Sequence, residues 1–182
     1  MKVNVIGCGL SGVTAAILLK EQGHDVEIFE TRSHIAGNCY DEKQDGVTVH
    51  KYGSHIFHTN DGDVWEFLNR YTKFNDYKHK VRANTKEGLL SIPFSKKTEE
   101  QLGRDLTPEE IKDLLFVDYS ERHWGTPWSD LPRSISRRVP NKRDNHDDRY
   151  FTDKYQGIPE NGYTEMFKSM LDGIKVNLSV DK

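Results

Sequence analysis

The chain has 182 residues, of which 30% are charged, and its formal net charge is −3 at pH 7. This length predicts one domain, or one domain with a small appendage, and the slightly negative balance argues against a nucleic-acid binder. Cys8 and Cys39 are too few for a disulfide framework and lack metal-ligand spacing, so we predict a reducing compartment and no metal site. The sequence has no apolar stretch of the roughly 20 residues that span a membrane. Its N-terminus enters an apolar run directly, so we expect a soluble, cytoplasmic protein with no signal peptide and no membrane partner.

The opening of the chain predicts a β-α-β unit. Residues 3–6 form a short apolar run suited to a buried parallel strand, and a helical pattern over residues 13–18 ends near Gly23. Residues 26–29 predict a second strand, with Glu30 at its carboxyl end. Three glycines with the spacing G-x-G-x-x-G connect the first strand to the helix. With the acidic residue at the expected distance, this context makes a dinucleotide-binding site much better supported than an ordinary glycine turn.

Each glycine of the fingerprint has a physical role. Gly7 allows a tight turn, Gly9 lets the backbone approach a pyrophosphate, and Gly12 lets the helix pack closely against the strand. The first helical residues, Leu10 and Ser11, are expected to offer unpaired N–H groups to the phosphates. Together these residues form the predicted phosphate-binding turn, called the phosphate turn below.

The loop after the second strand distinguishes between cofactors. Glu30, Arg32 and Gly37 form the pattern E-x-R-x-x-x-x-G, typical of FAD-binding proteins, and Glu30 is expected to bind the adenosine ribose. Arg32 has a second interpretation, because an arginine here can meet the 2′-phosphate of NADP. The continuation through Gly37 and Asn38 favours FAD, with Thr31 as a further contact.

The rest of the chain mixes short strands and helices. A strand is predicted over residues 47–52, a loop over 53–60, a helix over 63–71 and a β-hairpin over 79–94. Residues 95–105 are polar and predict a flexible linker, which is followed by a helix that begins with the capping box of Thr107 and Glu110. A last helix and strand are expected over residues 164–171 and 174–178. The predicted fold class is α/β: a Rossmann-like FAD/NAD(P)-binding domain over residues 1–182, with a parallel sheet and a small antiparallel β appendage.

Several separated motifs resemble the UDP-galactopyranose mutase family. They lie in family order over nearly the whole chain, and the strings His-Ile-Phe-His-Thr and Tyr-Gln-Gly-Ile-Pro are specific to that family. Beyond the glycine fingerprint the motifs occupy residues 52–59, 119–125, 131–132, 137–140, 150–159 and 162–164.

The resemblance implies a flavin-dependent isomerase that interconverts the pyranose and furanose forms of UDP-galactose. In that mechanism N5 of reduced FAD attacks the anomeric carbon, displaces UDP and forms a flavin–sugar adduct, without net redox change. The family positions imply that His55, Ile56 and His58 lie along the flavin, and that Trp124 lines the sugar and uridine pocket. Arg138 would close on the diphosphate, a role suited to guanidinium. The implied substrate contacts are Trp124, Arg138, Tyr150 and Tyr155.

Each of these residues can also be explained without the family resemblance. Either histidine could be a structural group, Trp124 could belong to the core with Trp128, and the basic run at 133–143 could be a solvated face. A nucleic-acid role for this run is disfavoured, because acidic residues follow it and the net charge is negative.

The chain also departs from the family pattern. Family members are about twice as long, and residues 95–118, a linker plus one helix, stand in place of their helical domain. The C-terminal half, with further flavin and diphosphate contacts, has no counterpart here. Ala36 and Ser54 replace the usual glycine and proline. Three interpretations stay open: a minimal mutase completed by homo-oligomerisation, a non-catalytic FAD- or nucleotide-binding module, and a fragment that needs a partner chain.

Overall fold

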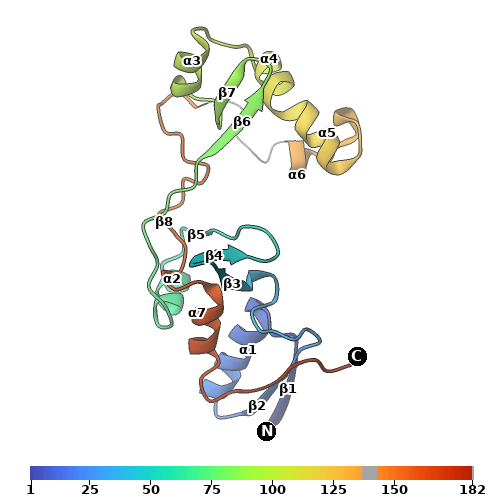
Figure 1. The fold of residues 1–182 in the computed structure, drawn as a ribbon, viewed down its shortest axis with the longest axis vertical. Coiled ribbons are helices and arrows are strands. Elements are labelled where there is room, and N and C mark those ends of the chain that lie inside the picture. Colours follow the sequence, from blue (N-terminus) through green and yellow to red (C-terminus); the bar gives the residue numbers. More distant parts are fainter. Residues whose placement is uncertain (137–142, 182) are drawn as a thin grey trace. The chain divides into compact units, whose positions relative to one another are not determined.

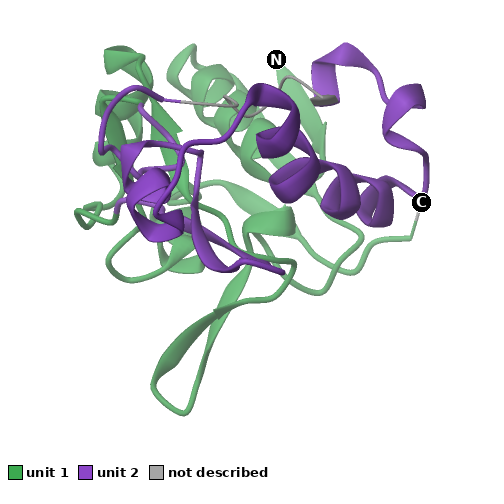
Figure 2. Cartoon of the chain, turned by 90° about the horizontal axis from the view of Figure 1, so that it is seen from above, with its two compact units in different colours: residues 1–77, 153–182 green, residues 78–152 purple. Residues whose placement is uncertain are grey.

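The structure is a computed structural model that describes residues 1–136 and 143–181. The chain folds as two compact units, which Figure 2 distinguishes by colour. Unit 1 comprises residues 1–77 and 153–182, and unit 2 comprises residues 78–152. Each unit has its own hydrophobic cluster. The assignment of residues 1–182 to a single domain stays a prediction.

A three-stranded parallel sheet organises unit 1. Its strands are β1 (Lys2–Ile6), β2 (Asp25–Phe29) and β9 (Lys175–Asn177), in the order β1-β2-β9. Helices α1 (Leu10–Glu21) and α7 (Tyr163–Met170) pack against each other beside the sheet (Figure 1). This arrangement confirms the predicted Rossmann-like α/β fold and the β-α-β unit at the start of the chain.

The core of unit 1 lies between the sheet and these two helices. Val13 and Ala16 of α1, Ile28 of β2 and Phe167 of α7 are all fully buried. The prediction of a buried first strand is only partly right, because Ile6 is 81% exposed. In β1 only alternate residues, such as Val3 and Val5, pack against the core, as expected of a strand with one covered face.

Two small antiparallel pairs complete unit 1. Strands β3 (Asp41–Gln44) and β4 (Val47–His50) form a hairpin, while β5 (Phe57–Thr59) pairs with the distant β8 (Tyr155–Gly157). Residues 53–60 were predicted as a loop, and β5 corrects that prediction. Its partner lies almost 100 residues further along the chain, so no local turn signal indicates the pairing. Helix α2 (Gly62–Asn69) and the 3₁₀ turn η1 (Gly37–Cys39) are the remaining elements that precede unit 2.

Unit 2 combines a hairpin with short helices. Strands β6 (Val81–Thr85) and β7 (Gly88–Ile92) form the predicted β-hairpin. The chain continues through α3 (Lys96–Leu102), α4 (Pro108–Lys112), the π-helical segment η2 (Asp113–Val117) and α5 (Asp118–Trp124) to η3 (Trp128–Asp130) and α6 (Arg133–Ser136). Leu90, Phe94, Ile111 and Leu115 form the core of the unit. Among the helices of the described residues, none is both long and apolar enough to cross a lipid bilayer.

Residues 95–105 are not the predicted flexible linker, because most of them form α3. The fully buried Thr98 explains the difference. Its hydroxyl accepts a hydrogen bond from the Ser95 N–H (3.1 Å) and donates one to the carbonyl oxygen of Ser91 (3.0 Å). Gln101 accepts the N–H of Ser91 (2.9 Å), so polar contacts hold this helix against β7. The capping box of Thr107 and Glu110 is present as predicted.

Candidate functional site

The glycine turn of unit 1 is shaped to hold a diphosphate. Gly9 is the N-cap of α1 and has no side chain to occupy the helix end, and the first turn carries no acidic residue. A Cβ at Gly12 would overlap the carbonyl oxygen of Gly7, whereas a Cβ at Gly9 would come no closer than 3.9 Å to any non-adjacent protein atom. Gly12 is therefore required by the fold, while the space at Gly9 is left open for a ligand. The N–H groups at the start of a helix attract phosphate in such a space.

Glu30 links the end of β2 to this turn. Its carboxylate accepts hydrogen bonds from the backbone N–H groups of Cys8 (2.8 Å) and Arg32 (2.9 Å), and from the Thr31 hydroxyl (3.3 Å). Burial raises the pKa of Glu30, but the N–H groups of Arg32 and Cys8 outweigh it and hold the pKa below its usual value. The carboxylate is therefore charged at neutral pH, and an ionised carboxylate suits the acceptor role expected toward a ribose hydroxyl.

The guanidinium of Arg32 is held in a position that suits anion binding. Its Nη2 donates to Asn38 (2.9 Å), and its guanidinium lies over the Tyr52 ring, 4.6 Å from the ring centre. The Tyr52 hydroxyl is 2.7 Å from Nε2 of His34, which fixes the ring. Nη1 of Arg32 is buried and has no hydrogen-bond partner among the described residues. Because a buried unsatisfied donor is costly, a phosphate oxygen of a bound cofactor is a fitting partner for Nη1.

Gly37 closes the other side of the turn. Its backbone is left-handed (φ +57°), and a Cβ here would come within 2.9 Å of the Gly9 Cα. Only glycine allows this approach of the two loops. Ala36, which replaces the usual family glycine, is buried and also left-handed (φ +72°), a conformation that costs an alanine about 1 kcal/mol.

His55 and Ile56 precede β5 and are partly buried. The His55 N–H donates to Nδ1 of His50 (3.0 Å), and the two imidazole rings lie edge-on to Tyr163. Nε2 of His55 is buried without a partner among the described residues. Like Nη1 of Arg32, this atom has hydrogen-bonding capacity that would suit a bound group.

His58 of β5 and Tyr155 of β8 lie on paired strands but differ in their surroundings. Nδ1 of His58 lies 2.7 Å from the Asp153 carboxylate. The Tyr155 ring stacks on Trp65, with 5.1 Å between ring centres, and Lys154 lies over it at 4.8 Å. Tyr155 therefore has a packing role in this structure, and its role as a substrate contact stays a prediction.

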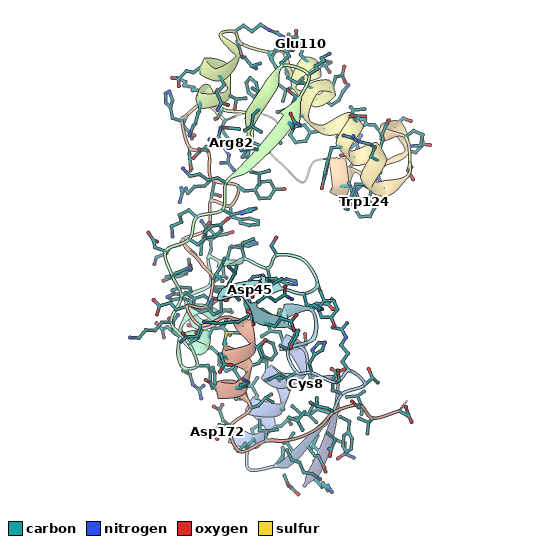
Figure 3. All side chains as sticks on the ribbon, viewed as in Figure 1. Cys8, Asp45, Arg82, Glu110, Trp124 and Asp172 are labelled. Carbon is teal, nitrogen blue, oxygen red and sulfur yellow. The ribbon has the colours of Figure 1, made fainter. Side chains whose placement is uncertain are left out.

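Unit 2 carries the remaining predicted substrate residues. Trp124 ends α5 and is 48% exposed, so it is not the core residue of the alternative interpretation (Figure 3). Tyr150 packs against the core of unit 2, and its ring contacts His79 and Phe151. Arg138 lies outside the described residues. Arg143, from the same basic run, is partly buried and donates to the carbonyl oxygens of Asp147, Arg149 and Tyr150, so this arginine is not part of a solvated face.

The structure brings ten of the predicted cofactor residues together around one turn of unit 1, while His55 and Ile56 lie before β5. The ten residues are Gly7, Gly9, Leu10, Ser11, Gly12, Glu30, Thr31, Arg32, Gly37 and Asn38. Sequence reasoning missed His34 and Tyr52, which support Arg32, and Asp153, which contacts His58. Tyr52 and Asp153 lie inside motifs that signalled the family, but nothing in the sequence indicates their partners.

The fold and the glycine turn are those of a Rossmann-like dinucleotide-binding domain. Residues 5–71 match the family model described as an NAD(P)-binding Rossmann-like domain. A crystal structure of a reduced UDP-galactopyranose mutase matches 100% of this chain and 49% of its own, with a TM-score of 0.74. At 15% sequence identity, that likeness shows the fold alone.

The sequence comparisons are more specific. Residues 114–182 match the family model of UDP-galactopyranose mutase. A dTDP-fucopyranose mutase of Escherichia coli is 36% identical over 100% of this chain and 56% of its own length. A probable UDP-galactopyranose mutase of Klebsiella pneumoniae is 33% identical over 99% of this chain and 55% of its own. The chain thus resembles these mutases along its whole length, which confirms the resemblance to the UDP-galactopyranose mutase family, and it spans about half the length of the curated relatives it matches.

Proposed function

We propose that this chain binds FAD through unit 1 and acts as a nucleotide-sugar mutase, in the reduced-flavin form, on UDP-galactopyranose and UDP-galactofuranose or a related nucleotide sugar. The observation that carries the proposal is the whole-length similarity to mutases, in a chain whose phosphate turn is intact. The E. coli relative is named for dTDP-fucopyranose, so a dTDP-sugar is a second substrate candidate. Homo-oligomerisation is part of the proposal.

Different residues of the chain bind different parts of the cofactor and the substrate. Glu30 holds the adenosine ribose, the start of α1 and Arg32 hold the diphosphate, and His55 lies toward the flavin. Reduced FAD, when bound, supplies the nucleophile for the anomeric carbon. Trp124 and Arg138 bind the nucleotide sugar, with Tyr150 and Tyr155 as further contacts.

Nη1 of Arg32 is relevant to the question of which dinucleotide binds. Its Nη1 could meet the pyrophosphate of FAD or the 2′-phosphate of NADP. FAD is favoured because Gly37 leaves the loop backbone against Gly9, where it can follow the diphosphate. NADP binding without FAD binding would contradict this choice.

A turnover assay on the full chain tests the proposal. The protein is reconstituted with FAD, reduced with dithionite and incubated separately with UDP-galactofuranose and dTDP-fucofuranose, and the pyranose product is quantified by chromatography. Pyranose formation that requires dithionite supports the mutase. Retention of FAD without turnover of either sugar contradicts the mutase and leaves a flavin-binding module or a chain that needs a partner.

A further inference from the structure

The imidazole of His58 is held by a carboxylate that the sequence did not single out. Nδ1 of His58 lies 2.7 Å from Oδ2 of Asp153, and Nδ2 of Asn60 donates to Oδ1 of the same carboxylate at 2.5 Å. Each carboxylate oxygen therefore has a partner from the β5 segment. The side chains of His58 and Asp153 are 37% and 24% exposed, so solvent screens this pair only in part.

Strand pairing and two further hydrogen bonds also hold the segment that carries Asp153. In the β5–β8 pair His58 lies opposite Gln156, and Thr59 lies opposite Tyr155. The Lys154 N–H donates to the side-chain oxygen of Asn60 (2.9 Å), and the Gln156 side chain donates to the carbonyl oxygen of Asp153 (2.8 Å). Asp153 is thus anchored on both sides, and its carboxylate has little freedom to turn away from His58.

The contact determines the tautomer of the imidazole. An ionised carboxylate only accepts hydrogen bonds, so Nδ1 of His58 must carry the proton that lies between the two groups. In the neutral ring Nε2 is then the unprotonated nitrogen. Carboxylates select the tautomer and orientation of histidines in this way at many catalytic and metal sites.

We propose that Asp153 is a positioning residue, which holds His58 as the Nδ1–H tautomer in a fixed orientation. Its catalytic meaning rests on the proposed function, in which His58 lies along the flavin. The geometric part concerns only residues of unit 1 and stands whether or not FAD binds.

Nitrogen NMR of the full chain tests the geometric part. Histidines are labelled with ¹⁵N, the His58 signals are assigned by their loss in His58→Gln, and the tautomer is read from two-bond ¹H–¹⁵N correlations at mildly alkaline pH. We expect the Nδ1–H tautomer in the native chain, and a shift toward Nε2–H in both Asp153→Asn and Asp153→Ala. Asn60→Ala is the comparison: it removes the other partner of the carboxylate and one anchor of the Asp153 segment but keeps the carboxylate, so it should shift the tautomer less than either Asp153 variant.

Two results would overturn the proposal: a native His58 in the Nε2–H form, or the same tautomer in all variants. The His55 signals serve as an internal reference, since His55 contacts His50 and Tyr163. If Asp153→Asn shifts the His55 signals as much as those of His58, unit 1 has rearranged and the effect is not specific, which also counts against the proposal.

Kinetics test the catalytic part. With the dithionite-dependent assay, Asp153→Asn should lower kcat by roughly tenfold to hundredfold, with KM changed less than threefold, as for other residues that orient a functional histidine. An unchanged kcat together with the expected tautomer shift would remove the catalytic role of Asp153 and keep its positioning role. A failure of the proposed function, seen as absence of FAD binding, would leave the NMR result intact.

Discussion

Gly9 is the N-cap of α1 and Gly12 lies in the first turn of that helix, but the two glycines have different roles. A methyl group at Gly12 would overlap the Gly7 carbonyl oxygen, whereas a methyl group at Gly9 would make only an ordinary contact with the Gly37 Cα, at 3.9 Å. We expect Gly12→Ala to lower the free energy of unfolding by roughly 3 kcal/mol, the cost of forcing an atom into a packed site. Gly9→Ala should fold normally, because Gly9 has an ordinary extended backbone (φ −84°), and should weaken FAD binding at least tenfold.

Urea unfolding and FAD titration of Gly9→Ala and Gly12→Ala test these two expectations. Each variant is the control for the other, because both add one methyl group to the same turn. Equal FAD affinity in Gly9→Ala and the native chain would mean that the pyrophosphate does not approach this backbone.

Arg138 is the residue whose role depends most on the family resemblance. A guanidinium that binds a diphosphate through two charge-assisted hydrogen bonds contributes about 1.5–3 kcal/mol. Arg138→Ala should therefore weaken UDP binding by roughly tenfold to hundredfold, as measured by calorimetry on the FAD-loaded chain. Arg133→Ala, an exposed arginine on α6, is the matched control and should bind UDP normally. Equal losses in both variants would indicate a general charge effect and count against a specific role for Arg138.

Helix α7 depends on a cap supplied from another element. Its own N-cap, Gly162, has no side chain, and the buried carboxylate of Asp41 accepts the N–H groups of Tyr163 (2.6 Å) and Thr164 (2.9 Å). The Thr164 hydroxyl donates to the carbonyl oxygen of Asp41 (2.7 Å), so β3 and α7 are joined at this point. Asp41→Ala should lower the free energy of unfolding by about 2 kcal/mol, the upper range for a helix cap.

Asp61→Ala provides the comparison for this cap. Asp61 caps α2 in the ordinary way and is exposed, so its loss should cost about 1 kcal/mol. Urea unfolding of both variants measures the difference. A cost for Asp41→Ala no larger than that for Asp61→Ala would contradict the cross-element role.

The elements that could be predicted from sequence are those with local signals. The glycine fingerprint, the capping box at Thr107 and the apolar periodicity of α7 each predicted an element that the structure contains. Helix α3 could not be predicted because its anchor is the polar Thr98, which bonds to Ser91. Strand β5 was missed because it pairs with β8, and neither strand carries a turn signal that indicates the other.

The candidate site also contains residues that a local motif predicts and residues that only the fold brings together. The residues around the phosphate turn follow from one continuous motif, so the sequence predicted them together. The His58–Asp153 contact joins residues that are 95 positions apart, and only the fold reveals it. The roles of Trp124, Arg138 and Tyr150 rest on family motifs and stay predictions.

At the scale of the whole molecule, acid should weaken unit 2 through Asp148. This buried carboxylate bonds to Lys97 (2.5 Å) and Lys80 (2.9 Å), which lower its pKa from 3.8 to about 2. Because the pKa is lower in the folded state, the stabilisation is present above about pH 4 and is lost as the pH falls through about 2. Since both lysines are partly exposed, we expect a contribution of about 1 kcal/mol.

Urea unfolding of Asp148→Asn at several pH values tests this contribution. The variant should be less stable than the native chain at pH 7, and the difference should shrink as the pH approaches 2. Asp144→Asn, at an exposed position of the same loop, should show no such dependence. A difference that stays constant with pH would contradict the assignment to Asp148.

The central claim is that unit 1 binds FAD, and the visible absorption spectrum of the full chain tests it most directly. The purified protein is incubated with FAD, passed through a gel-filtration column and scanned, with Gly9→Ala treated in parallel. We predict a protein-bound flavin spectrum in the native chain and its loss, or strong reduction, in a folded Gly9→Ala variant. A native chain that elutes without flavin, or a Gly9→Ala variant that retains as much flavin as the native chain, would contradict the account.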